Sequence, residues 1–77
     1  MNFGSALEAL KAGIKVSRSG WNGKGLWLTR QLPGVNSKVD LPYIYMRYPS
    51  DDQNTPDRLV SWFPRDSDLF SEDWEIA

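Results

Sequence analysis

The first dozen residues repeat apolar side chains with the spacing of a helix. The apolar positions are Phe3, Ala6, Leu7 and Leu10. Residues three, four and seven positions apart share one face of an α-helix, so the pattern predicts a helix over residues 3–12. Asn2 or Ser5 can cap the start of this helix, and Gly13 stands where a helix commonly ends.

Beyond Gly13, short apolar segments alternate with polar turns, which is typical of β-strands. The predicted strands are residues 14–18, 26–30, 41–48, 58–63 and 74–76, with one helical turn at residues 66–70 and polar loops at residues 31–40 and 49–57. We expect the first two strands to form a hairpin across a glycine-rich turn. The order of elements predicts the α+β class, with an N-terminal helix packed on a small, mainly antiparallel β-sheet in one compact domain.

The size of the chain limits how its core can be stabilised. Seventy-seven residues form one domain with a small core, and the absence of cysteine excludes disulfides and thiolate metal sites. The absence of histidine removes the commonest general base and metal ligand. Four Trp, three Tyr and three Phe supply apolar area for packing, and the small size favours an oligomer.

Charge is distributed unevenly along the chain. The net charge of −1 argues against binding to a polyanion, although residues 1–30 carry five bases and one acid while residues 66–77 carry five acids and no base. These two ends form solvated faces of opposite sign, or they pair within the fold or across a subunit contact. No signal peptide or membrane-spanning segment is evident, so we expect a cytoplasmic protein.

The carboxylates give little indication of catalysis. Asp51 and Asp52 fall in a predicted loop, and Asp66 and Asp68 are explained by capping of the helical turn. Without histidine or cysteine, the usual nucleophilic triads cannot form, and no acidic spacing matches a known metal-binding loop. We therefore expect a binding protein that is not an enzyme and uses no cofactor or metal.

The glycine-rich turn at residues 17–25 is the most distinctive segment. Its three glycines can expose successive backbone N–H groups to an anion, and Arg18 and Lys24 add positive charge. Trp21 either stacks on a planar base or folds back into the core beside the helix. The glycine spacing matches neither a Walker loop nor a dinucleotide-binding fingerprint.

Aromatic side chains dominate the second half of the chain. Tyr43 and Tyr45 share one side of a predicted strand with Arg47, and Trp62 and Trp74 follow in later strands. Tyrosines beside an arginine can line a cleft for a nucleotide-like ligand, or they can form a subunit interface. Both interpretations remain open at the level of sequence.

Several segments together resemble a known family. They are MNFGSALEALKAG at residues 1–13, VSRSGWNGKG at 16–25, LPYIYM at 41–46, LVSW at 59–62 and DLFSEDWEI at 68–76. In these segments the chain resembles the second class of phage Thoeris anti-defence "sponge" proteins. The resemblance covers nearly the whole chain and lacks a strong pattern only at residues 31–40 and 49–57.

The resemblance implies a single sponge-like domain over residues 1–77. Members sequester cyclic nucleotide immune messengers, especially glyco-cyclic ADP-ribose, without cleaving them, and some also hold CBASS cyclic oligonucleotides in a separate pocket. They are homotetramers with pockets between subunits. The implied role is inhibition of bacterial immunity in the host cytoplasm, during infection or from a prophage. The alternatives are a nucleic-acid-binding module, which the net charge opposes, and a small hydrolase of the same messengers that uses Asp68 or Asp73.

The resemblance also assigns roles to individual residues. It implies that Trp21 stacks on a base, that Asn22 bonds a ribose or base edge, and that Asp73 accepts from ribose hydroxyls. Trp74 contacts the ligand or, equally, closes the core against the first helix. The candidate ligand-binding residues are Arg18, Trp21, Asn22, Lys24, Tyr43, Arg47, Trp62, Asp73 and Trp74.

Overall fold

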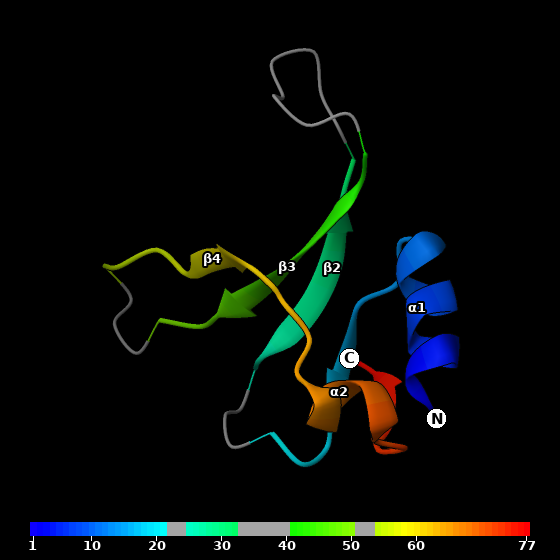
Figure 1. Cartoon of the computed structure of the whole chain (residues 1–77). Coiled ribbons are helices and arrows are strands. Elements are labelled where there is room, and N and C mark those ends of the chain that lie inside the picture. Colours follow the sequence, from blue (N-terminus) through cyan, green and yellow to red (C-terminus); the bar gives the residue numbers. More distant parts are fainter. Residues whose placement is uncertain (22–24, 33–40, 51–53) are drawn as a thin grey trace.

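The computed structural model describes residues 1–21, 25–32, 41–50 and 54–77, and it has the predicted α+β architecture (Figure 1). Its elements are α1 Phe3–Lys11, β1 Val16–Arg18, β2 Trp27–Gln31, β3 Tyr43–Tyr48, β4 Arg58–Ser61, α2 Asp66–Phe70 and β5 Trp74–Ile76. Each element lies within two residues of its predicted position. No helix among the described residues is long and apolar enough to cross a membrane.

Helix α1 begins at the predicted residue and ends at Lys11, one residue before the predicted end. The Asn2 side chain accepts a hydrogen bond from the Ser5 backbone N–H at 2.9 Å, so Asn2 is the capping residue. Gly13 has a φ of +85°, in the left-handed region that glycine adopts without steric cost. The helix therefore stops at Lys11, and the chain turns back toward the sheet.

The sheet has the strand order β4-β3-β2-β1-β5, and every neighbouring pair is antiparallel. The hairpin of β1 and β2 is confirmed, with Val16 opposite Leu28. The last strand, β5, pairs with the other edge of β1 and places Trp74 opposite Arg18. This long-range pairing brings the acidic end of the chain against the basic one.

One face of the sheet packs against α1 and forms the core. The buried apolar residues are Ala6, Leu10, Val16, Leu28, Met46 and Trp74. Ala6 and Leu10 belong to the predicted apolar face of the helix, which is therefore confirmed as the core face. Trp74 is the largest buried side chain and is only 2% exposed.

The opposite face, called the outer face below, carries the side chains of Trp27, Tyr43, Tyr45 and Arg47. The ring centroids of Trp27 and Tyr45 lie 6.5 Å apart, and the Arg47 guanidinium lies 5.5 Å from the Trp27 ring. The Lys15 ammonium sits over the same ring at 4.4 Å. The predicted sharing of one side by Tyr45 and Arg47 is confirmed.

Candidate functional site

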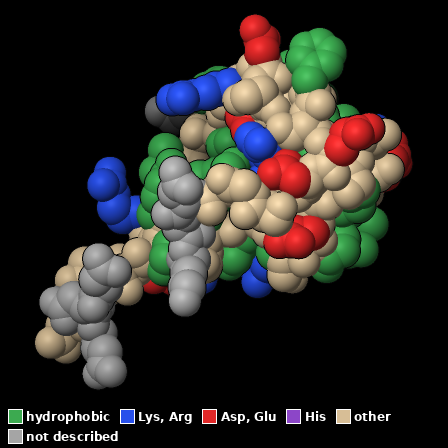
Figure 2. All heavy atoms as spheres, turned by 90° about the horizontal axis from the view of Figure 1, so that it is seen from below, with side chains coloured by type: hydrophobic (Ala, Val, Ile, Leu, Met, Phe, Trp, Pro, Cys, Tyr) green, Lys and Arg blue, Asp and Glu red, His purple; other side chains and the backbone are tan. Residues whose placement is uncertain are grey.

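A groove of about 630 Å³ lies beside α2 on the core side of the sheet. Its lining residues are Arg18, Trp21, Met46, Tyr48, Ser61, Trp62, Phe63, Pro64, Arg65, Ser67 and Asp68. Three predicted site residues, Arg18, Trp21 and Trp62, therefore meet in one place. Figure 2 views the molecule from below, the side on which α2 lies in Figure 1, and shows basic, acidic and apolar side chains close together there.

Trp21 and Trp62 both line the groove and both pack against the buried Trp74. The Trp21 ring meets Trp74 edge-on, with centroids 5.4 Å apart and an interplanar angle of 80°. The Trp62 ring does the same at 6.0 Å and 87°. Both rings are only partly buried, so each supports the core and lines the groove. Trp21 thus folds back against the core, as one of the two interpretations of the sequence predicted, while its stacking on a ligand stays a prediction.

Trp74 closes the core. Its ring packs 5.4 Å from that of Phe3 in α1, and its indole N–H donates to the Asp68 carbonyl oxygen at 2.9 Å. The Trp74 side chain is buried in this chain. It therefore closes the core against the first helix, which is one of the two roles that the sequence analysis predicted. A direct contact between Trp74 and a ligand stays a prediction.

Arg18 binds two carboxylates, and Arg18, Asp68 and Asp73 are called the Arg18 cluster below. Its Nε donates to Asp73 Oδ1 and its Nη1 to Asp68 Oδ1, both at 2.8 Å. The side chains of Arg18 and Asp68 are 16% and 9% exposed. The basic and acidic ends of the chain therefore pair within the fold at this point.

The cluster favours the charged forms of Arg18 and Asp73. The hydrogen bond from Arg18 holds the pKa of Asp73 below its usual value. In turn, the hydrogen bonds to Asp73 and then Asp68 raise the pKa of Arg18. Asp73 is thus a carboxylate that accepts hydrogen bonds from its own chain.

Asp73 also holds the turn that carries Trp21. Its Oδ2 accepts from the Gly20 N–H at 2.9 Å, and its carbonyl oxygen accepts from the Ser19 N–H at 3.1 Å. A Cβ on residue 20 would lie 2.7 Å from that Oδ2, which explains why a glycine stands there. Asp73 thereby fixes the chain immediately before Trp21. Its predicted contact with ribose hydroxyls stays a prediction.

Two predicted site residues, Asn22 and Lys24, lie outside the described residues. Tyr43 and Arg47 lie on the outer face and are not brought to the groove within this chain. Arg47 donates from Nε to Asp57 Oδ2 at 2.7 Å and from Nη1 to the Gly25 carbonyl at 3.2 Å. The ligand contacts predicted for Tyr43 and Arg47 therefore stay predictions.

The site prediction omitted Tyr48, Phe63 and Arg65, all of which line the groove. Strand alternation gave a signal for Tyr48, because it stands two positions after the core residue Met46 and shares its face. Phe63 is 81% exposed, an unusual environment for so large an apolar ring. No local pattern singled out Arg65.

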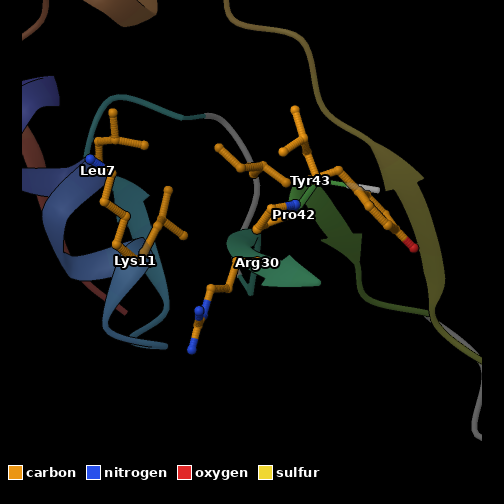
Figure 3. Close-up of a pocket in the computed structure, with 8 residues that line it drawn as sticks. Leu7, Lys11, Arg30, Pro42 and Tyr43 are labelled. Atoms are coloured by element: carbon orange, nitrogen blue, oxygen red, sulfur yellow. The ribbon is translucent and has the colours of Figure 1, made fainter. Parts of the chain in front are cut away.

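A second cavity, of about 360 Å³, lies between α1 and the beginning of β3 (Figure 3). Leu7 and Lys11 come from the helix, Arg30 from β2, and Pro42 and Tyr43 from the chain at the start of β3. Its walls are largely apolar and offer few hydrogen-bonding groups. A polar molecule therefore fits the groove better than this cavity.

The groove offers groups for binding. It combines aromatic faces, two serines and arginine side chains in a volume suited to a small molecule. Within the described ranges, no three acidic side chains come together in a way that could hold a metal ion. The carboxylates of Asp68 and Asp73 both face Arg18, which satisfies them as hydrogen-bond acceptors.

The chain is similar to known proteins over its whole length. A family model described as a Thoeris anti-defense 2-like domain matches residues 1–77. The chain is also 32% identical over 85 residues to a protein named Thoeris anti-defense 2 from Bacillus phage SP01. That similarity covers 100% of this chain and 94% of the phage protein.

Proposed function

The chain belongs to the Thoeris anti-defense 2-like family, and from this premise we propose that it is a phage inhibitor of Thoeris immunity that sequesters a cyclic nucleotide signal. The proposed signal is of the glyco-cyclic ADP-ribose type, with CBASS cyclic oligonucleotides as a second class. The protein would act in the bacterial cytoplasm by keeping the free signal from its effector. It would release the bound signal unchanged.

The observation that carries this proposal is the composition of the groove. Trp21, Trp62 and Phe63 offer aromatic faces beside arginine side chains. A nucleotide messenger needs both kinds of group, since its bases stack and its phosphates require cations. Base–aromatic stacking contributes about 1–3 kcal/mol per base, and a nanomolar dissociation constant corresponds to about −12 kcal/mol. Several such contacts are therefore needed at once, and the groove supplies them in one place.

A binding role without turnover suits the carboxylates of the site. Asp68 and Asp73 are the nearest candidates for acid–base chemistry, and both are hydrogen-bonded to Arg18. The lowered pKa of Asp73 makes it a weak general base. Both carboxylate oxygens of Asp68 already accept hydrogen bonds, from the Arg18 side chain and the Arg65 backbone N–H. Sequestration requires no proton transfer, so the arrangement supports a protein that holds its ligand intact.

We further propose that the protein is a homotetramer and that a second subunit encloses the groove. The groove is open to solvent in one chain, whereas tight sequestration needs an enclosed ligand. The outer face exposes Tyr43 and Leu59, and tyrosine is enriched in interfaces. This face would provide a contact between subunits.

The test is a filtration assay with purified protein and glyco-cyclic ADP-ribose. The filtrate is analysed by liquid chromatography before and after the protein is heated. Loss of the ligand and its recovery intact on heating are expected. Degraded ligand would instead indicate a hydrolase, and undiminished free ligand at micromolar protein would refute this messenger, after which cyclic oligonucleotides are tested in the same way.

Two phenylalanines provide a matched pair of variants for the same assay. Phe63 lines the groove and is 81% exposed, while Phe70 of α2 is 84% exposed and does not line it. Neither substitution by alanine opens a cavity in the core. Phe63→Ala is expected to weaken retention of the ligand, and Phe70→Ala to leave it unchanged. Equal effects would exclude the groove as the binding site.

A further inference from the structure

Two arginines line the groove, and they differ in what their side chains already bind. Arg18 places its guanidinium between Asp68 and Asp73, so one positive charge faces two negative ones. The Arg18 cluster therefore carries a net negative charge. Arg65 follows Pro64 at the beginning of α2 and lines the same groove.

The hydrogen-bonding capacity of Arg18 is largely used within the chain. Its Nε, Nη1 and Nη2 all contact carboxylate oxygens, at 2.8, 2.8 and 3.5 Å. A phosphate could take these donors only by displacing a carboxylate, which would leave that carboxylate partly buried without its partner. Arg18 is thus poorly placed to bind a second anion.

The Arg65 side chain is in the opposite situation. Its backbone N–H donates to Asp68 Oδ2 at 2.9 Å, which fixes the position of the residue beside the cluster. Among the described residues, no hydrogen bond or ion pair holds its guanidinium. A guanidinium presents a planar set of donors that matches the oxygens of a phosphate.

We propose that Arg65 is the residue of the groove that binds the phosphate groups of the ligand, and that Arg18 does not contact them. The inference rests on the proposed function, because it concerns a nucleotide with a phosphate or diphosphate. Arg18 instead positions the turn before Trp21 through Asp73, whose Oδ2 accepts from the Gly20 N–H. The base would lie on the aromatic side chains, and the phosphates would lie at the α2 end of the groove.

Binding of glyco-cyclic ADP-ribose to three variants tests this assignment by calorimetry at two salt concentrations. Arg65→Gln is expected to bind about 10- to 100-fold more weakly, as for the loss of a hydrogen bond to a charged group. Its affinity should also depend less on salt than that of the wild type. Arg65→Lys keeps the positive charge but loses the planar set of N–H donors, so its affinity is expected to lie between those of the wild type and Arg65→Gln.

Arg30→Gln is the matched control, since it removes the same charge at the second cavity, away from the groove. It is expected to bind like the wild type. Thermal unfolding of all three variants checks that each one folds. If the wild type binds and the affinity of Arg65→Gln is within twofold of the wild-type value, the inference is overturned and the proposed function stays intact.

Nuclear magnetic resonance separates failure of the inference from failure of the proposed function. The arginine Nε–Hε signals are followed during titration with inorganic pyrophosphate and with glyco-cyclic ADP-ribose. The Arg65 signal is expected to shift with either probe, while the Arg18 signal stays in place. A shift with pyrophosphate alone would support the anion site and refute this messenger. A shift at Arg18 without one at Arg65, or no shift at either residue, would overturn the inference.

Discussion

Gly20→Ala adds one methyl group at the closest approach between the turn and the Arg18 cluster. The new Cβ would lie 2.7 Å from Asp73 Oδ2, a separation too short for real side chains. The same oxygen accepts the hydrogen bond from the Gly20 N–H at 2.9 Å. Because Arg18 also holds the carboxylate through Oδ1, Asp73 cannot move away without weakening that pair as well. We therefore expect the substitution to destabilise the fold.

The magnitude follows from two opposing terms. Loss of a hydrogen bond to a charged acceptor costs about 1.5–3 kcal/mol, and the solvent-accessible position of this turn favours the lower end. Alanine also restricts the unfolded chain, which stabilises the protein by about 0.4–1 kcal/mol. This gain applies because Gly20 does not have a left-handed φ, unlike Gly13 and Gly25. The net loss is about 1–2 kcal/mol, or roughly 6–12 °C in Tm for a chain of this size.

Gly4→Ala is the control for this measurement. Its Cβ would lie 3.4 Å from Asn2 Oδ1, an ordinary contact on the exposed side of α1. Alanine is favoured over glycine within helices, so this variant is expected to gain about 0.5–1 kcal/mol. Urea and thermal unfolding followed by circular dichroism compare both variants with the wild type.

A double-mutant cycle decides whether the carboxylate is the cause. In an Asp73→Ala background the contact disappears, and Gly20→Ala is then expected to be neutral or slightly stabilising. The proposed role of Asp73 in holding the turn is refuted if Gly20→Ala is as stable as the wild type. It is also refuted if Gly20→Ala lowers the free energy of unfolding equally with and without Asp73.

Three further predictions concern the cluster and the core. Arg18→Met leaves two carboxylates without their partner and is expected to lower the free energy of unfolding in urea by about 3 kcal/mol. Arg47→Met, at a more exposed ion pair, is expected to lower it by less than about 1 kcal/mol. The folded pKa of Asp73 is lowered from the ordinary 3.8, so the ionised carboxylate stabilises the fold above that value, and this contribution is lost as pH falls through the folded pKa. Asp73→Asn should therefore make the free energy of unfolding depend less on pH in the acid range. An unchanged slope would contradict the pairing of Asp73 with Arg18. Leu10→Ala removes a buried side chain and is expected to cost about 2–5 kcal/mol in thermal unfolding, while Leu69→Ala, at a side chain that is 41% exposed, should cost less than about 1 kcal/mol.

The local elements could be predicted because their signals are local. The apolar spacing of α1, the Asn2 cap and the left-handed Gly13 all lie within a dozen residues. Alternation and glycine content likewise predicted the hairpin of β1 and β2. Such patterns reflect the backbone geometry of single elements, which each segment adopts largely by itself.

The site depends on contacts that no local pattern encodes. Arg18 binds carboxylates 50 and 55 positions away in the sequence, and the acidic end offered five candidates for that pairing. The sequence also left Trp74 between a structural and a ligand-binding role, because both use the same aromatic ring. Its burial beside Phe3 and the indole bond to Asp68 depend on the strand order, which only the folded chain reveals.

The position of β5 beside β1 has a consequence for the kinetics of folding. β1 and β2 are synthesised early, but the second edge of β1 stays unpaired until residues 74–76 have been made. Pairings between such distant segments form slowly, and an open strand edge exposes unpaired backbone groups in the meantime. The segment that arrives last also carries Asp73 and the core residue Trp74. The nascent chain therefore has no formed groove, because the residues of β5 and Asp73 that support Trp21 arrive only at the end of synthesis.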